Sequence, residues 1–111
     1  MLEALWSVQF ATPQGMAGGG VVVFETGRIF GGDTSFFYVG AYDKVKDDGI
    51  LNANVRVSRH APGLQSVFGL EDFELTLSGK IGAKNFDVIG SLVADPRQQL
   101  NVHLKHIADL P

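Results

Sequence analysis

The chain has 111 residues, of which 45% are hydrophobic and none is cysteine, and its formal net charge at pH 7 is −3. This length predicts one domain, residues 1–111, and the scattered Lys and Arg residues argue against direct binding of nucleic acid. The lack of cysteine favours a reducing, cytoplasmic environment. Neither a signal peptide nor an apolar run of about 20 residues, the length that spans a membrane, is found, so no membrane association is expected.

The hydrophobic pattern is typical of β-strands along the whole chain. Apolar and polar residues alternate with a period of two, and turn-forming residues interrupt this alternation at short intervals. The pattern predicts strands at residues 3–11, 18–25, 28–31, 35–45, 50–59, 71–78, 85–94 and 99–107. Residues 62–69 break the alternation and predict a lid or a single helical turn.

Apolar side chains on one face of three of these segments predict the interior of the domain. In residues 3–11 the apolar positions alternate with Ser7 and Gln9, and the segments at 71–78 and 85–94 repeat this pattern. Such residues either fill a core or line a pocket, and the sequence leaves both alternatives open. The residues predicted to do so are Trp6, Val8, Phe10, Phe73, Leu75 and Phe86.

Two turns are predicted around aspartate residues. Asp33, after Gly31 and Gly32, is expected to close an Asx-turn onto its own backbone. Asp95-Pro96-Arg97-Gln98, much later in the chain, fits a type I turn.

The segment at residues 35–45 is the most aromatic part of the chain. Apolar side chains occupy both of its faces, so both faces need to be covered. We therefore predict a homodimer in which Phe36, Tyr38 and Tyr42 lie at or near the contact between subunits.

A mixed-charge hairpin follows this aromatic segment. It reads Asp43-Lys44-Val45-Lys46-Asp47-Asp48, and Asp48-Gly49 is a strong signal for the tip of a β-hairpin. Either this is an ordinary solvated loop, or Asp43, Asp47 and Asp48 bind a partner, because exposed loops on rigid scaffolds often carry binding residues.

Eight strands joined by short connections predict an all-β fold. An open sheet would expose two unpaired edges, whereas closure into an antiparallel up-and-down barrel removes both. An eight-stranded barrel is just wide enough for packed side chains or one small ligand. A sandwich of two sheets is the alternative fold.

Residues of the types used in catalysis and metal binding are not arranged in a recognisable motif. His103 and His106 are three residues apart on a strand and so face opposite sides, which argues against a shared metal. Ser91 lies within a strand, outside a nucleophile-elbow motif. Gly18-Gly19-Gly20 precedes a strand, whereas a phosphate-binding loop precedes a helix. We therefore expect no enzyme activity, metal or cofactor.

Several segments together are similar to one known family. They are Leu5-Trp6-Ser7-Val8-Gln9-Phe10, Val21-Val22-Val23-Phe24, Gly27-Arg28-Ile29-Phe30-Gly31-Gly32-Asp33, Tyr38-Val39-Gly40 and Arg56-Val57-Ser58-Arg59-His60. On these residues the chain resembles the GrlR-like family, negative regulators of type III secretion and their uncharacterised relatives. The resemblance implies a lipocalin-like barrel with an apolar interior that forms a homodimer. It also implies that an acidic hairpin after the aromatic strand contacts a DNA-binding activator, although here Lys44 and Lys46 interrupt the acidic run.

Two functions are therefore expected from the sequence. The first is a non-enzymatic regulator that binds a protein partner, such as a transcriptional activator, through the hairpin. The second is a barrel that binds a small, apolar, lipid-like ligand. The first needs an exposed partner surface, and the second needs a hollow interior.

Overall fold

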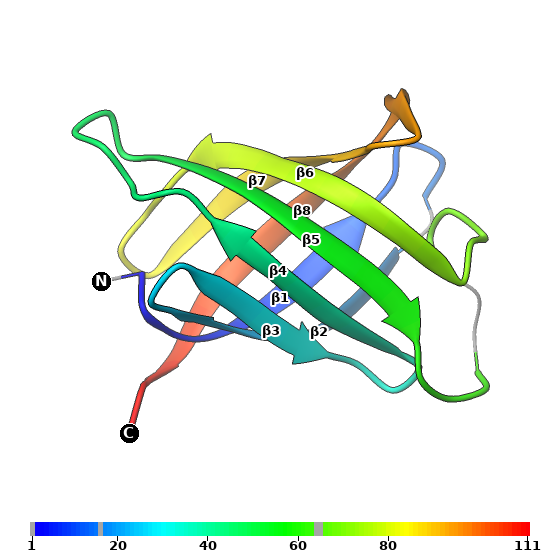
Figure 1. Cartoon of the computed structure of the whole chain (residues 1–111), viewed down its shortest axis with the longest axis horizontal. Helices are drawn as coiled ribbons and strands as arrows, with labels where there is room; N and C mark the ends of the chain where they lie inside the picture. Colours follow the sequence, from blue (N-terminus) through cyan, green and yellow to red (C-terminus); the bar gives the residue numbers. More distant parts are fainter. Residues whose placement is uncertain (1, 16, 64–65) are drawn as a thin grey trace.

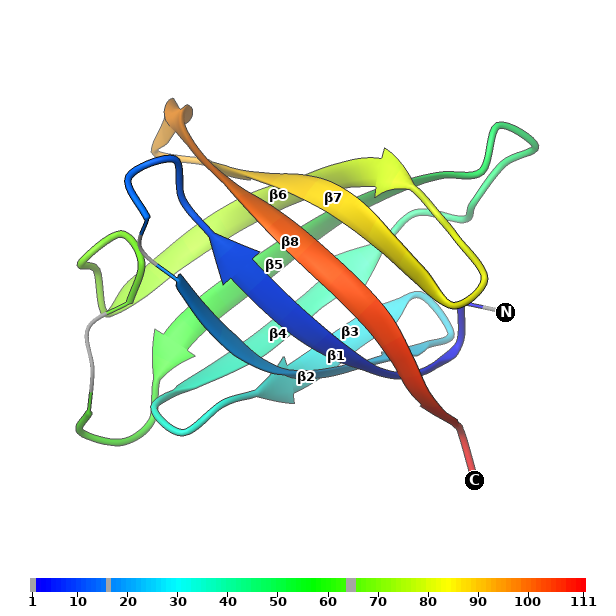
Figure 2. The ribbon, with the colours of Figure 1, turned by 180° about the vertical axis from the view of Figure 1, so that it is seen from behind.

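Eight antiparallel strands close into a single barrel in the computed structural model, which describes residues 2–15, 17–63 and 66–111 (Figure 1). Each strand pairs with its neighbour in the chain, and β8 pairs with β1 to complete the ring, as Figure 2 shows from behind. The predicted fold class, an eight-stranded up-and-down barrel, is confirmed. The strands are β1 (Ala4–Ala11), β2 (Ala17–Glu25), β3 (Arg28–Gly32), β4 (Phe36–Tyr42), β5 (Ile50–Arg59), β6 (Asp72–Lys80), β7 (Asn85–Leu92) and β8 (Asp95–Asp109).

The last hairpin differs from the one predicted. The chain turns at Val93 and Ala94, so that β8 begins four residues earlier than expected, at Asp95. Leu92 pairs with Asp95 and Ser91 with Gln99, so residues 96–98 form an irregularity in the strand where a type I turn was predicted. A bulge tolerates Pro96, because proline cannot donate a hydrogen bond to the sheet.

The segment between β5 and β6 contains no helix among its described residues. Of the two alternatives predicted for residues 62–69, a lid or a single helical turn, the described residues do not form the helical turn. Near its end the chain makes one hydrogen-bonded turn, in which the Gly69 N–H donates to the Ser66 carbonyl at 3.0 Å, and Gly69 adopts a positive φ of 70°. Glycine suits this left-handed conformation because it has no Cβ. More generally, no helix in the described part of the chain is long and apolar enough to cross a membrane.

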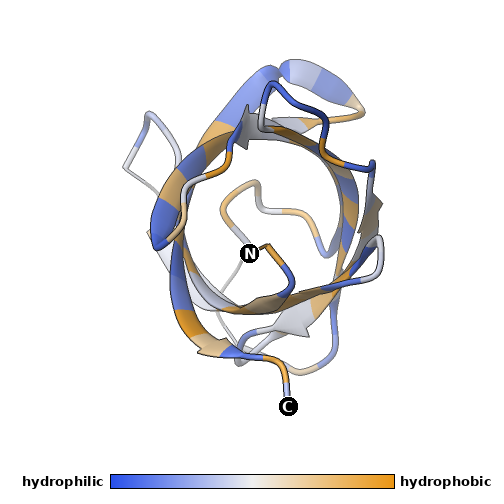
Figure 3. Cartoon of the chain, turned by 90° about the vertical axis from the view of Figure 1, so that its left-hand side faces the viewer, coloured by the Kyte–Doolittle hydropathy of each residue, from blue (hydrophilic) through white to orange (hydrophobic). Residues whose placement is uncertain are grey.

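The period-two alternation of the sequence builds the core. Residues at alternate positions of every strand point into the barrel, and Figure 3 shows the strands as a ring seen from one end. The fully buried large side chains are Trp6, Phe24, Leu51 and Val88.

The two ends of the barrel carry different connections. The turns after β2, β4 and β6 and both chain termini lie at one end, which we call the closed end. The connections after β1, β3, β5 and β7 lie at the other, which we call the open end.

Candidate functional site

The barrel encloses a cavity of about 420 Å³ that opens at the open end. All eight strands contribute to its lining, and aliphatic side chains such as Val22, Val57 and Val102 make up most of it. Four of the residues predicted from the sequence for this role do line it, namely Val8, Phe10, Phe73 and Leu75. A volume in this range is typical of small-molecule sites.

The closed end is filled with aromatic side chains. The Trp6 indole is fully buried and its Nε1 donates a hydrogen bond to the Leu2 carbonyl at 2.9 Å. The Phe86 ring meets the indole edge to face, with ring centroids 5.0 Å apart. Neither residue lines the cavity, which corrects their assignment as lining residues. They are residues of the packed core near this end.

The mouth of the cavity carries a polar cluster built on the turn between β3 and β4. Asp33 Oδ1 accepts hydrogen bonds from the backbone N–H groups of Ser35, at 2.9 Å, and Phe36, at 2.8 Å. The first of these is the Asx-turn expected from the sequence. The Tyr38 hydroxyl donates to Asp33 Oδ2. Burial, and then this bond to Asp33, raise the pKa of Tyr38 well above its usual range, so its hydroxyl stays protonated.

Gly20 in β2 makes room for this hydroxyl. A Cβ atom at this position would lie 2.9 Å from the Tyr38 hydroxyl oxygen and 2.6 Å from the Gly32 carbonyl oxygen, closer than real contacts allow. The neighbouring Gly18 similarly leaves space for the Phe10 ring, which a Cβ would approach to 2.7 Å. The run Gly18-Gly19-Gly20 thus shapes the mouth of the barrel, and it holds no phosphate-binding helix.

The connection between β5 and β6 covers part of the mouth. Ser66 and Val67 line the cavity, and the Ser66 hydroxyl donates to the Leu70 carbonyl at 2.6 Å. The Phe68 ring packs edge to face on Phe73, with centroids 5.5 Å apart. The segment was predicted to be a lid, and these described residues do cover the cavity. Residues 64 and 65 of the prediction lie outside the described part.

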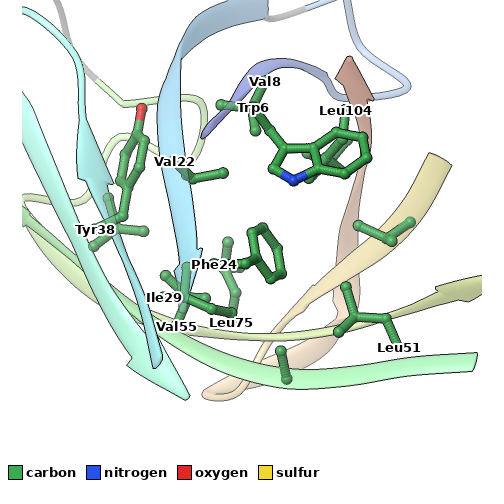
Figure 4. Close-up of a cluster of buried hydrophobic side chains, with 14 of the residues drawn as sticks. Trp6, Val8, Val22, Phe24, Ile29, Tyr38, Leu51, Val55, Leu75 and Leu104 are labelled. Carbon is green, nitrogen blue, oxygen red and sulfur yellow. The ribbon is translucent and has the colours of Figure 1, made fainter. Parts of the chain in front are cut away.

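Two of the three aromatic residues assigned to a dimer contact point into the barrel. Phe36 and Tyr38 are buried and line the cavity, and Figure 4 shows Tyr38 among the interior side chains. Their assignment to a subunit contact is wrong, because the period of two places them on the inner face of β4. Tyr42 packs against the core beside Phe24, with ring centroids 5.4 Å apart.

The outer face of β2, β3 and β4 carries apolar side chains instead. Phe37 and Val39 on β4 are 41% and 53% exposed. Val39 pairs with Phe30, and both Phe37 and Val21 pair with Gly32 of the strand between them. We call these four side chains, Val21, Phe30, Phe37 and Val39, the outer apolar patch.

The charged hairpin projects from the closed end, away from the mouth of the cavity (Figure 1). Asp43, Asp47 and Asp48 are all exposed there. Asp48 has a local role, because its Oδ1 accepts the Ile50 N–H at 3.0 Å, and Gly49 at the tip has a φ of 71°. Asp43 and Asp47 have exposed side chains beside Lys44 and Lys46.

The histidines lie apart from one another. His103 Nδ1 is 3.0 Å from Asp87 Oδ1 on the outer face, and His106 Nε2 is 3.0 Å from Asp109 Oδ1 near the end of β8. His60 Nε2 donates to the Asp33 backbone carbonyl at 3.0 Å, beside the mouth. Among the described residues, no group of three or more His, Cys, Asp or Glu side chains is placed to hold a metal ion.

Sequence reasoning missed the polar cluster as a site. Asp33 was assigned only a turn role and Tyr38 only a subunit contact, although Asp33 lies in the turn that leads into β4 and Tyr38 lies near the start of that strand. Comparisons with known proteins add no further assignment: no family model matches the sequence, and no curated protein matches it.

Proposed function

We propose that this protein binds one small apolar molecule inside its barrel. The observation that carries the proposal is the 420 Å³ cavity, which is lined mainly by apolar side chains and reaches the connections at the open end of the barrel. Burial of apolar surface favours occupation of such a cavity by about 25 cal/mol per Å² removed from water. The packed aromatic side chains near the closed end and the partial cover at the open end favour retention of a molecule once it has entered.

We propose a binding role without catalysis. His60 lies beside the mouth, and its Nε2 donates a hydrogen bond to the backbone carbonyl of Asp33 at 3.0 Å. A histidine that acts as a general base in catalysis would instead contact the hydroxyl group of a nucleophile. We also place the protein in the cytoplasm, because its sequence uses no cysteine.

A neutral apolar dye, whose fluorescence rises when it leaves water, tests the proposed function. Val55 lines the cavity, so Val55→Trp should fill it and abolish dye binding. Ile89→Trp adds the same side chain to the outer face, away from the outer apolar patch, and serves as the control. Native mass spectrometry should detect a one-to-one adduct in the unmodified protein. No dye binding, or equal binding by the filled variant, would contradict the proposal.

A second candidate function is supported by the hairpin at the closed end. Its exposed Asp43 and Asp47 fit a basic surface on a protein partner, as the resemblance to the GrlR-like regulators implies. Because this hairpin and the cavity mouth lie at opposite ends of the barrel, partner binding and ligand binding would not compete for space.

The resemblance also implies a homodimer, for which the outer apolar patch offers a surface. Exposed apolar patches on a protein of this size often mark contacts with other proteins. We propose that a second copy of the chain covers Phe37 and Val39, and not the buried Phe36 and Tyr38.

A further inference from the structure

The cavity has polar side chains at its mouth, and the charge of this polar cluster restricts which ligands can bind. Among the described residues that line the cavity, Asp33 is the only one with a side chain charged at neutral pH. The rest of the lining near the mouth contributes hydroxyl groups and apolar surface. A ligand that buries its apolar part in the barrel must therefore place its head group beside a carboxylate.

The Asp33 carboxylate can accept one more hydrogen bond, from a ligand, beside those that it already accepts. Oδ1 already receives two backbone N–H groups, and Oδ2 receives the Tyr38 hydroxyl. A carboxylate has about four acceptor positions, so Oδ2 retains one. Because the proton of Tyr38 is committed to Asp33, the phenol oxygen also offers the ligand an acceptor.

The cationic side chain of Arg59 is directed toward other partners. The Arg59 guanidinium lies over the Phe36 ring, 4.7 Å from its centroid, and does not line the cavity. Its Nε is 3.5 Å from Glu71 Oε1, and its NH1 group donates to the Ala61 carbonyl at 3.1 Å. This arrangement offsets the charge of Arg59 and leaves Asp33 to set the charge preference of the mouth.

We infer that the barrel selects a single-chain amphiphile whose head is a primary ammonium group, with the chain in the cavity and the head on Asp33 and Tyr38. An ammonium donates hydrogen bonds and is attracted to the carboxylate, whereas a fatty-acid carboxylate is repelled by it. A neutral alcohol, which donates one hydrogen bond, should be intermediate. This inference rests on the proposed function, since it names the class of ligand for the same cavity.

Decylamine, 1-decanol and decanoic acid provide a matched test, because they share one chain and differ in the head group. Each is titrated at neutral pH, below its micelle-forming concentration, to displace the neutral dye from the cavity. We expect affinity to fall in the order amine, alcohol, acid, with about a tenfold difference between amine and acid for a partly solvated charge pair. The amine preference should shrink as salt is added.

Asp33→Asn is the control for the role of the charge. The amide keeps an oxygen for the Ser35 and Phe36 N–H groups but removes the charge, so affinities for amine and acid should converge. Tyr38→Phe keeps the charge and should keep the order. Failure of the dye itself to bind would contradict the proposed function, whereas a bound dye that none of the three compounds displaces would overturn this inference alone. Binding of all three with the acid equal or tighter, or an amine preference that persists in Asp33→Asn or in high salt, would overturn this inference alone.

Discussion

The Trp6 indole and the Phe86 ring meet edge to face at a centroid distance of 5.0 Å, and both are packed in the core while neither lines the cavity. On the closed side, the indole N–H is bonded to Leu2 and the side chain has no exposed surface. On the other side, the lining residues face a cavity of about 420 Å³. Loss of a side chain should therefore cost more at the closed end than at the mouth.

Truncation of Phe86 and of Phe73 tests this difference. Phe86→Ala should lower the free energy of unfolding by about 3–5 kcal/mol, as expected for an aromatic side chain in a packed core. Phe73→Ala enlarges a space that is already hollow, and should cost at least about 1 kcal/mol less. Urea unfolding measures both. Equal losses would indicate that the interior around Phe73 is packed as tightly as the closed end.

The bond between Tyr38 and Asp33 predicts a pH dependence of stability at high pH. The pKa of Tyr38 is raised in the folded protein above its ordinary value of 10.0. The folded state therefore holds the phenol proton more tightly than the unfolded state, and the stabilisation is complete below about pH 10 and lost as pH rises above it. Tyr38→Phe should remove this part of the decline. Unfolding curves for both proteins from neutral pH upward measure it, and parallel declines would contradict it.

The close approach of other atoms to Gly20 predicts that a glycine-to-alanine substitution lowers the free energy of unfolding more at this position than at Gly90. Gly20→Ala places a Cβ 2.6 Å from a backbone oxygen, which cannot move independently, and should cost about 1–3 kcal/mol. At Gly90, also in a strand, a Cβ would approach only the flexible side chains of Leu77 and Leu100, at 3.2 and 3.4 Å. Gly90→Ala should therefore cost less. Thermal unfolding of the two variants gives the comparison, and a smaller cost at Gly20 would refute it.

The fold could be predicted from the sequence because the two-residue alternation of apolar and polar residues and the positions of turn-forming residues both indicate β-strands along most of the chain. Alternation in β5, for example, places Leu51, Val55 and Val57 inside and Asn52 outside, and the structure has the same arrangement. Where both faces of a strand are apolar, as in β4, alternation cannot tell which face is inside. That ambiguity led to the wrong assignment of Phe36 and Tyr38.

The candidate site was less predictable because it depends on contacts across the barrel. A cavity is a volume left between strands, so Phe73 at its wall and Phe86 in the packed end have the same local pattern in the sequence. The bulge in β8 likewise depends on how this strand pairs with β7. The local turn propensities of Asp95 and Pro96 give no information about that pairing. Asp33 was placed correctly in its turn, but its bond to Tyr38 required the orientation of β4.

The outer apolar patch predicts where the proposed homodimer would form its contact. Burial of a large apolar side chain contributes roughly 1.5–3 kcal/mol. Replacement of Phe37 and Val39 together by lysine should therefore shift a dimer to monomer in sedimentation experiments at tens of micromolar protein. Ile89→Lys, at a similarly exposed apolar position on β7, is the control and should leave the dimer intact. An unmodified protein that is monomeric under these conditions would rule out the dimer.

The charged hairpin yields the last prediction, which concerns binding to a DNA-binding activator with a basic surface. Asp43 and Asp47 attract such a partner and Lys44 and Lys46 repel it, so opposite substitutions should have opposite effects. Asp43→Lys with Asp47→Lys should weaken binding, and Lys44→Glu with Lys46→Glu should strengthen it. Asp48 is left unchanged, because its Oδ1 accepts the Ile50 N–H and supports the turn.

Exposed charges act mainly on the rate of association, and a single exposed pair contributes only about 0–1 kcal/mol. Asp47→Ala alone should therefore have a small effect, while the two double variants should differ clearly in association rate at low salt and converge as salt is raised. Surface plasmon resonance at several salt concentrations measures these rates. Asp87→Lys, on the outer face of β7, tests whether a charge reversal away from the hairpin has the same effect. If the hairpin variants bind as the unmodified protein does, or if Asp87→Lys has an equal effect, the hairpin is an ordinary solvated turn and the partner surface lies elsewhere on the barrel.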